Sequence, residues 1–361
     1  VVLTNLGSSY SDVADYDYVG LRLATGGGSG GVIDNVSLTP LALETPQALV
    51  SHDTGYTIMK VRSARAGTND FIVAASYEGA VLWLSYDGVT QWTNELTGYM
   101  VHDLWCEDLT GDGTDEVLVA DADGYLYCLN GATGAMLWQF APTTGPHKTP
   151  MYGVCVVKNP GGTLYVACGG YDKNFYWLSA TGQKLKTVVS STYSLDRPWG
   201  DDRWVGYGHT VNFLRPIPQA DGSDHLVLAG TMSHMQSPGS LYFFLPLAEL
   251  PYSSINITGT KTTGDLRVCD PDGDGTNEFL IGSSALTDQF LVRYDPASGV
   301  MTHFALTGIG AYAVAYNLVQ VRSALYTKVR LAWFVGPHKL ADMPTPYKHD
   351  KFPYVPFFGK R

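Results

Sequence analysis

Two short acidic segments of the chain share one spacing of oxygen-bearing side chains. In each segment a glycine at the sixth position permits a sharp turn. Oxygens at positions 1, 3, 5, 7 and 9 of such a loop converge into the hard cage that Ca²⁺ prefers. The alternative is an Asp-rich turn without a metal. The expected calcium ligands are Asp108, Thr110, Asp112, Thr114 and Glu116 in the first loop and Asp270, Asp272, Asp274, Thr276 and Glu278 in the second.

A second group of residues combines histidine with tyrosine and arginine. His209 begins one predicted strand and His234 follows the next, so antiparallel pairing would bring the two imidazoles together. With Tyr207 and Arg203 in reach they could form an acid–base group, or a zinc site if further ligands join them. For each histidine the simpler alternative is a hydrogen-bonded loop residue. The candidate catalytic residues are His102, His147, Arg203, Tyr207, His209 and His234.

Aromatic residues and arginines accompany these histidines. The richest run is STYSLDRPWGDDRWVGYGH, residues 191–209. Long loops on a rigid scaffold often carry function, and arginine pairs with carboxylates in a bidentate manner. A groove with these side chains would suit an anionic polysaccharide, although the aromatics could instead pack the loop onto the scaffold. The candidate substrate-binding residues are Tyr152, Arg197, Trp199 and Trp204.

The elements that must position these residues are short strands. Residues 102–140 contain four apolar runs, DLWCE, EVLVA, YLYCL and AMLWQF, separated by an acidic loop and tight turns. This pattern predicts a four-stranded antiparallel meander. Its first strand recurs as YTIMKV (56–61), HDLWCE (102–107), MYGVCVV (151–157), GHTVNFL (208–214), DLRVCD (265–270) and YAVAYNLV (312–319).

The recurrence predicts an all-β fold, a β-propeller. The first strands start at intervals of roughly 44–57 residues, the range of four-stranded propeller blades. Six repeats are visible over residues 46–361. Residues 1–45 read as a hairpin that either closes the ring, which we favour, or ends a carbohydrate-binding module. With closure we expect seven blades.

The order of strands also assigns loops to faces. The acidic loops join the first and second strands of their blades, so we expect their ions to stiffen blades rather than do chemistry. The candidate catalytic residues precede first strands or follow second strands, and these loops share the opposite face. Asp121 and Asp123 lie on that face too, but we expect no paired acids of the kind a glycoside hydrolase needs.

Composition limits the class of protein. The formal net charge of −11 argues against nucleic-acid binding, and no run of 18 apolar residues could span a membrane. The five cysteines lie in apolar strand runs without a CxxC motif, so we expect buried thiols. Few charged residues and an acidic surface are typical of a secreted protein, which we expect to be a monomer.

Two stretches resemble known propeller repeats. The acidic loops resemble the calcium loops of FG-GAP propellers. GYLYCLNGATGAMLWQF resembles a PQQ-type repeat, in which a turn like ATG precedes a strand ending in Trp. The resemblance to PQQ-type repeats covers roughly residues 50–305 and concerns the fold more than the function.

The mix of residues also resembles that of secreted propeller polysaccharide lyases, notably the ulvan lyases. That resemblance implies β-elimination on a uronic-acid polymer. Arg203 would neutralise the uronate carboxylate, His102 or His209 would take the C5 proton, and Tyr207 would protonate the leaving oxygen. Two alternatives are a non-catalytic carbohydrate-binding or adhesion propeller and a PQQ-like scaffold protein.

Overall fold

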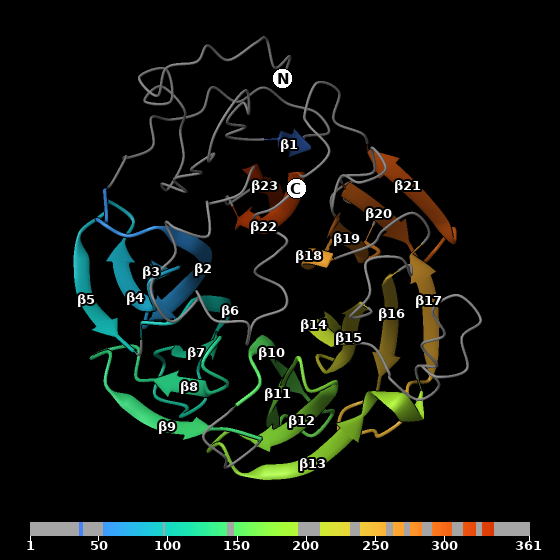
Figure 1. The fold of residues 1–361 in the computed structure, drawn as a ribbon, viewed down its shortest axis with the longest axis horizontal. Coiled ribbons are helices and arrows are strands. Elements are labelled where there is room, and N and C mark those ends of the chain that lie inside the picture. The colour runs from blue at the N-terminus through green and yellow to red at the C-terminus, as the bar shows by residue number, and fades with distance from the viewer. Residues whose placement is uncertain are drawn as a thin grey trace.

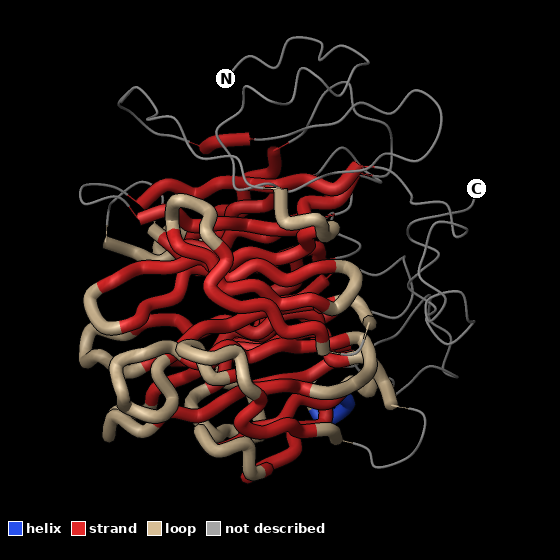
Figure 2. Tube along the Cα trace, turned by 90° about the vertical axis from the view of Figure 1, so that its left-hand side faces the viewer, coloured by secondary structure: helices blue, strands red, loops and turns tan. Residues whose placement is uncertain are grey.

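Almost all regular structure in the protein is β-strand, as Figure 2 shows. The computed structural model describes residues 36–38, 53–96, 98–142, 148–193, 210–231, 239–257, 263–270, 275–283, 291–304, 313–322 and 327–335. Across these ranges the single helical element is a 3-10 turn, η2 (Ser190–Thr192). None of the helical structure within them is long and apolar enough to cross a membrane. The all-β prediction is confirmed.

Five four-stranded antiparallel sheets follow one another along the chain, and we call them blades 1 to 5 (Figure 1). Blades 1 and 2 contain β2 (Ile58–Ala66), β3 (Asn69–Ser76), β4 (Ala80–Ser85), β5 (Thr90–Glu95), β6 (Val101–Glu107), β7 (Glu116–Asp121), β8 (Leu126–Leu129) and β9 (Met136–Phe140). Blade 3 contains β10 (Met151–Lys158), β11 (Leu164–Gly170), β12 (Asn174–Ser179) and β13 (Lys184–Val189). Blades 4 and 5 contain β14 (Thr210–Pro218), β15 (Asp224–Thr231), β16 (Gly239–Phe244), β17 (Ser253–Ile257), β18 (Thr263–Cys269), β19 (Glu278–Ser283), β20 (Leu291–Asp295) and β21 (Val300–Phe304).

A sixth sheet of three strands joins the two ends of the chain. It contains β22 (Ala313–Arg322), β23 (Thr327–Val335) and β1 (Val36–Leu38), with Ser37 opposite Arg330. The predicted count of seven blades is not confirmed, since the described residues form six sheets. The division of the chain at residue 45 stays a prediction.

The blades surround a common axis. The first strands lie innermost and the fourth strands lie at the rim (Figure 1). Each of the inner strands β2, β6, β10, β14, β18 and β22 contacts the next, and β22 also contacts β2. Fourth strands such as β9 and β13 are mostly solvent-exposed, while β7 is buried along its whole length. The predicted propeller architecture is therefore confirmed.

Alternation along the strands builds the core. Val117 and Val119 of β7 pack with blade 1, whereas Leu118 and Ala120 pack with blade 3. Successive side chains of a strand point to opposite faces, so one apolar strand fills two interfaces between blades. Each fully buried Val or Leu contributes about 1.5–3 kcal/mol relative to an exposed one.

All five cysteines are free thiols, and four of them are buried. The expectation of buried thiols is confirmed for Cys128, Cys155, Cys168 and Cys269, while Cys106 is partly exposed.

Every inner strand contains one β-bulge near its beginning. In β6 the register pairs Val101 with Asp121 and Asp103 with Ala120, which leaves His102 as the extra residue. A bulge redirects the inserted side chain and sharpens the local twist. Because all inner strands begin at the same end of the axis, the extra residues form a ring there. They are Met59, His102, Tyr152, Asn212, Gly264 and Tyr316.

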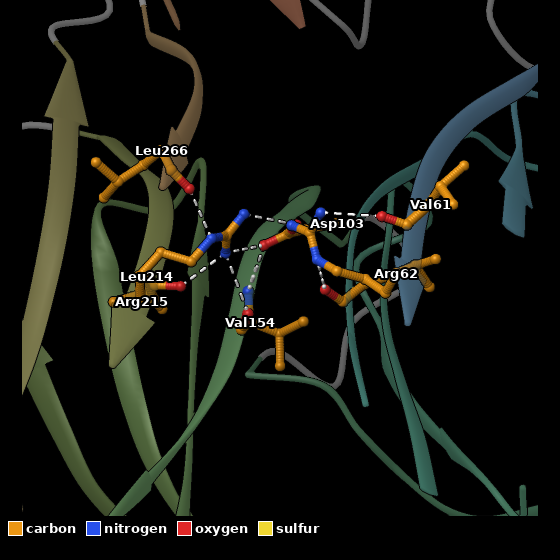
Figure 3. Close-up of polar contacts among 8 residues, drawn as sticks. Val61, Arg62, Asp103, Val154, Leu214, Arg215 and Leu266 are labelled. Atoms are coloured by element: carbon orange, nitrogen blue, oxygen red, sulfur yellow. Dashed lines mark hydrogen bonds and ion pairs between the residues drawn. The ribbon is translucent and has the colours of Figure 1, made fainter. Parts of the chain in front are cut away.

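Below this ring lies a buried ionic network centred on Asp103 (Figure 3). Arg62 of blade 1 donates to Asp103 Oδ1 over 3.1 Å, and Arg215 of blade 4 donates to both carboxylate oxygens over 2.7 and 3.0 Å. The backbone N–H of Val154 in blade 3 donates to Oδ2 over 3.2 Å. Arg215 Nε also donates to the Leu266 carbonyl of blade 5 over 2.9 Å. One carboxylate of blade 2 thus connects four other blades, directly or through Arg215.

We expect Asp103→Asn to lower the free energy of unfolding by about 3–5 kcal/mol, because it leaves buried guanidinium groups without their carboxylate. The matched control is Asp70→Asn, which removes an exposed ion pair with Arg65 (3.5 Å) and should cost no more than about 1 kcal/mol. Urea unfolding measures both. Equal effects of the two substitutions would show that the network does not hold the blades together.

Candidate active site

In the described part of the chain, one face of the propeller carries turns that follow second strands and segments that enter inner strands. The turns after second strands pack against the segments that enter the inner strands, as shown by Ala122 N–H donating to the Met100 carbonyl (2.9 Å) and Tyr171 N–H donating to the Pro150 carbonyl (3.1 Å). We call this the upper face. The bulge ring lies at the same end of the axis.

Three aromatic rings of blades 2 and 3 meet on the upper face. The His102 and Tyr152 rings are edge-to-face with centroids 4.6 Å apart, and Tyr171 follows Tyr152 at 6.4 Å. His102 and Tyr152 are both bulge residues from adjacent inner strands. Two sequence-predicted site residues are therefore in contact, and we call these three side chains the aromatic row.

The surroundings of His102 keep its imidazole neutral. Its pKa is lowered to about 3, first by burial and then by the nearby Lys60 ammonium, which together outweigh the opposing effect of Asp103. A group with so low a pKa is a weak proton acceptor at neutral pH. His102 is therefore better suited to hydrogen bonding and ring stacking than to the role of base that the lyase resemblance implied.

The upper face also contains a pair of carboxyl groups that we did not expect. Asp121 is buried and half-buried Asp123 follows it in the β7–β8 turn. Asp123 N–H donates to Asp121 Oδ1 over 2.9 Å, and the Tyr127 hydroxyl donates to Asp123 Oδ2 over 2.6 Å. Burial, followed by the neighbouring carboxylate of Asp123, raises the pKa of Asp121 well above its usual range. The two acids lie in one turn and are not the opposed carboxyl pair of a glycoside hydrolase, so the expectation that this face lacks such a pair stays a prediction.

The first acidic loop lies on the opposite face and joins blade 2 to blade 1. Asp115 N–H donates to the Arg65 carbonyl (2.8 Å), and Gly67 N–H donates to the Gly113 carbonyl (2.8 Å). Asp108 already accepts backbone hydrogen bonds from residues 111, 112 and 113. The loop therefore links blade 2 to blade 1 through backbone hydrogen bonds, and the expectation that its ion stiffens the blade stays a prediction.

The oxygen donors of this loop fit a calcium ion only in part. Asp108 is engaged by the loop backbone, but Glu116 is buried and its Oε1 accepts no hydrogen bond from the described residues. In the second loop Asp270 Oδ2 accepts from Gly275 N–H over 2.9 Å, as Asp108 Oδ2 does from Gly113, and Glu278 pairs with Arg293. No cluster of His, Cys, Asp and Glu with metal-site geometry occurs in the described ranges. Calcium stays a prediction, as does zinc.

Most of the other predicted site residues lie outside the described residues. Thr276 lies in the described part of the second loop, between Gly275 and β19. The residues outside are His147, Arg197, Trp199, Arg203, Trp204, Tyr207, His209, His234, Asp272 and Asp274.

A cavity of about 640 Å³ lies away from the upper face, among the loops at the other end of blades 3 and 4. Its lining includes Tyr165, Gln219, Asp221 and His225. Hydrogen bonds from Ser223 lower the pKa of Asp221, so this carboxylate is ionised at neutral pH. The cavity therefore does not suit the anionic polysaccharide that sequence analysis predicted as partner.

Comparison with known proteins decides the family. The family described as "Lambda-carrageenase beta-propeller domain" matches residues 71–341. The chain belongs to this family. It is 41% identical over 247 residues to lambda-carrageenases from Pseudoalteromonas sp and Pseudoalteromonas carrageenovora. The matched segment is 68% of this chain and 26% of each relative, so the chain corresponds to about a quarter of their length.

Solved structures show a similar fold at low sequence identity. BBS1N, from its complex with ARL6DN, matches with a TM-score of 0.51 and 15% identity, covering 83% of this chain and 81% of BBS1N. Sqt1 of Saccharomyces cerevisiae matches with a TM-score of 0.50 and 11% identity, covering 78% of this chain and 73% of Sqt1. At such identities the likeness concerns architecture alone.

If calcium occupies the first loop, adding it should raise the melting temperature of the wild-type protein, and chelation should lower it. The increase should disappear in Glu116→Gln, which replaces the buried carboxylate with a neutral amide. Thermal unfolding with and without calcium, together with metal analysis, measures this. An identical melting temperature of the wild type in calcium and in chelator would exclude a bound ion.

Proposed function

We propose that this propeller binds and hydrolyses a sulfated galactan of the lambda-carrageenan type. The observation that carries the proposal is the family match over residues 71–341, supported by 41% identity to two lambda-carrageenases. A propeller offers the loops of one face as a shared binding surface on a rigid scaffold. The function is therefore sought on the upper face.

Hydrolysis replaces the β-elimination that sequence analysis predicted. Elimination needs a carboxylate next to the C5 proton, and a galactan has no uronic acid to supply it. Cleavage of a galactoside bond instead needs an acid that protonates the leaving oxygen and a water that attacks the anomeric carbon. A carboxyl group with a raised pKa, such as that of half-buried Asp123, suits the first of these roles. Ulvan and the lyase class therefore form no part of the proposal.

The upper face combines features that suit a sulfated sugar. The aromatic row of His102, Tyr152 and Tyr171 offers ring surfaces for stacking. The Lys148 ammonium lies 4.5 Å from the centre of the Tyr125 ring and acts electrostatically on Asp123. A local cation is needed because the whole chain has a formal net charge of −11, which repels an anionic polymer.

A non-catalytic carbohydrate-binding propeller is the second candidate. The observation that favours it is that the chain matches only 26% of each lambda-carrageenase, so cleavage by those enzymes could involve other parts of their chains. Secretion of the protein, which its composition predicts, fits either candidate.

We expect the purified protein to release new reducing ends from lambda-carrageenan without the ultraviolet absorbance of an unsaturated uronate. A desulfated galactan of similar length is the matched control and should be bound and cut more weakly, since it lacks the charges that Lys148 would contact. Reducing-sugar assay and calorimetric titration measure cleavage and binding. Absence of both would contradict the proposed function, whereas binding without cleavage would favour the binding module.

A further inference from the structure

The blades carry different residue types at one position that the strand register makes equivalent in all five. In each blade one residue at the end of the second strand pairs with the inner-strand residue that directly precedes the bulge. From blade 1 to blade 5 this residue is Ser76, Asp121, Gly170, Gly230 and Ser283. Four blades use a small or hydroxyl residue, and blade 2 uses an acid.

The fold does not require an acid at this position. In blade 1 the Ser76 hydroxyl accepts hydrogen bonds from the backbone N–H groups of Glu78 and Ala80, over 3.1 and 3.0 Å. In blade 2 Asp121 Oδ1 performs the same task for Asp123 N–H. The second carboxylate oxygen of Asp121, Oδ2, takes no part in this hydrogen bond.

That second oxygen is costly for stability. Asp121 is fully buried, and its Oδ2 accepts no hydrogen bond from the described residues. An unsatisfied buried polar atom destabilises the folded state. A proton on Asp121 relieves this cost, because a protonated acid can donate to the neighbouring Asp123 carboxylate. Costly groups that the fold does not need are often found at functional sites.

Asp123, in contrast, has an equivalent acid in blade 3. Its bond with Tyr127 recurs in blade 3, where the Tyr176 hydroxyl donates to Asp172. Blade 3 has Gly170 in place of the second acid, so Asp172 stands alone. The two turns therefore form a natural comparison in which one has a carboxyl pair and the other a single carboxyl group.

The turn that holds the pair is tightly fixed. Gly124 has a φ of 89°, and a Cβ atom there would lie 2.7 Å from the Thr149 carbonyl oxygen. Asp123 Oδ1 accepts from Tyr125 N–H over 2.8 Å. The charged and titratable groups that act on the pair are Tyr125, Tyr127 and Lys148, and both acids have a raised pKa chiefly because of burial. The pair is thus fixed in place before any ligand binds.

We propose that Asp121 and Asp123 share one proton and together form the acid of glycosidic cleavage, an inference that rests on the proposed function. Half-buried Asp123 is the catalytic residue that would contact the sugar, and buried Asp121 is a positioning residue that keeps the proton available. The shared proton passes to the glycosidic oxygen as its bond to the anomeric carbon breaks. The oxygen of a water molecule bonds to that carbon, one water proton goes to solvent, and the pair regains a proton from solvent.

The pair supplies one of the two groups that hydrolysis uses. The acid and its opposing carboxylate in glycosidases lie about 5–9.5 Å apart on either side of the bond, whereas Asp121 and Asp123 lie in one turn, where Asp123 N–H donates to Asp121 Oδ1 over 2.9 Å. The opposing group therefore comes from another part of the upper face.

The direct test replaces Asp121 with the residue that blade 1 uses at this position. Asp121→Ser should melt at the same temperature as wild type or higher, and bind lambda-carrageenan oligosaccharides equally well. Its kcat should fall about 10²–10⁴-fold, the usual contribution of general acid catalysis. The pH at which kcat/KM declines on the alkaline side should also move lower, since Asp123 without its neighbouring acid loses its proton more readily. Asp172→Asn, in the single-acid turn, is the matched control and should keep wild-type rate and pH profile.

Each outcome separates this inference from the proposed function. If wild type cleaves the polymer and Asp121→Ser cleaves it at the same rate with the same pH profile, the acid pair is wrong and the function stands. If wild type neither binds nor cleaves it, both fail. Binding without cleavage by wild type overturns the acid pair and leaves a binding module. Should Asp121→Ser not fold, Asp121→Asn keeps the shape of the side chain and is read by the same criteria.

Discussion

One buried carboxylate, Asp103, is the interaction on which the arrangement of the blades depends most. It accepts hydrogen bonds from Arg62 and Arg215, which come from blades on either side of the axis (Figure 3). Burying these charges is unfavourable unless each is paired, so the inner strands must keep one relative position. Contacts between apolar side chains fill the interfaces, but they are less directional than this network.

This constraint reaches the upper face through the β-bulges. Asp103 directly follows the bulge residue His102. It accepts a hydrogen bond from the backbone N–H of Val154, which lies two residues after the bulge residue Tyr152. Fixing Asp103 therefore fixes the two rings that meet edge-to-face with centroids 4.6 Å apart. The register of β6 with β7 then places Asp121 beside the same bulge. The buried network thus positions the bulge residues, and the proposed acid pair lies beside one of these bulges.

Sequence patterns predicted the strands, their antiparallel order and the face on which each loop lies. They did so because alternation and turn residues are local signals, as in the run from His102 to Phe140. The bulges, the partners of Asp103 and the meeting of Asp121 with Asp123 depend on register and on contacts between distant strands. A partial signal was present in the sequence, since Lys60, Arg62 and Arg215 are charged residues inside otherwise apolar inner strands. Asp121 is likewise an acid where the other blades have a small or hydroxyl residue, but those equivalent residues can be identified only from the strand register.

A crystal structure with a bound sulfated galactan oligosaccharide tests the account most directly. The account predicts that the sugar crosses the upper face over the aromatic row, with a glycosidic oxygen within hydrogen-bond distance of Asp123. An oligosaccharide bound among the acidic loops at the opposite end of the axis, or one on the upper face far from blades 2 and 3, would contradict it.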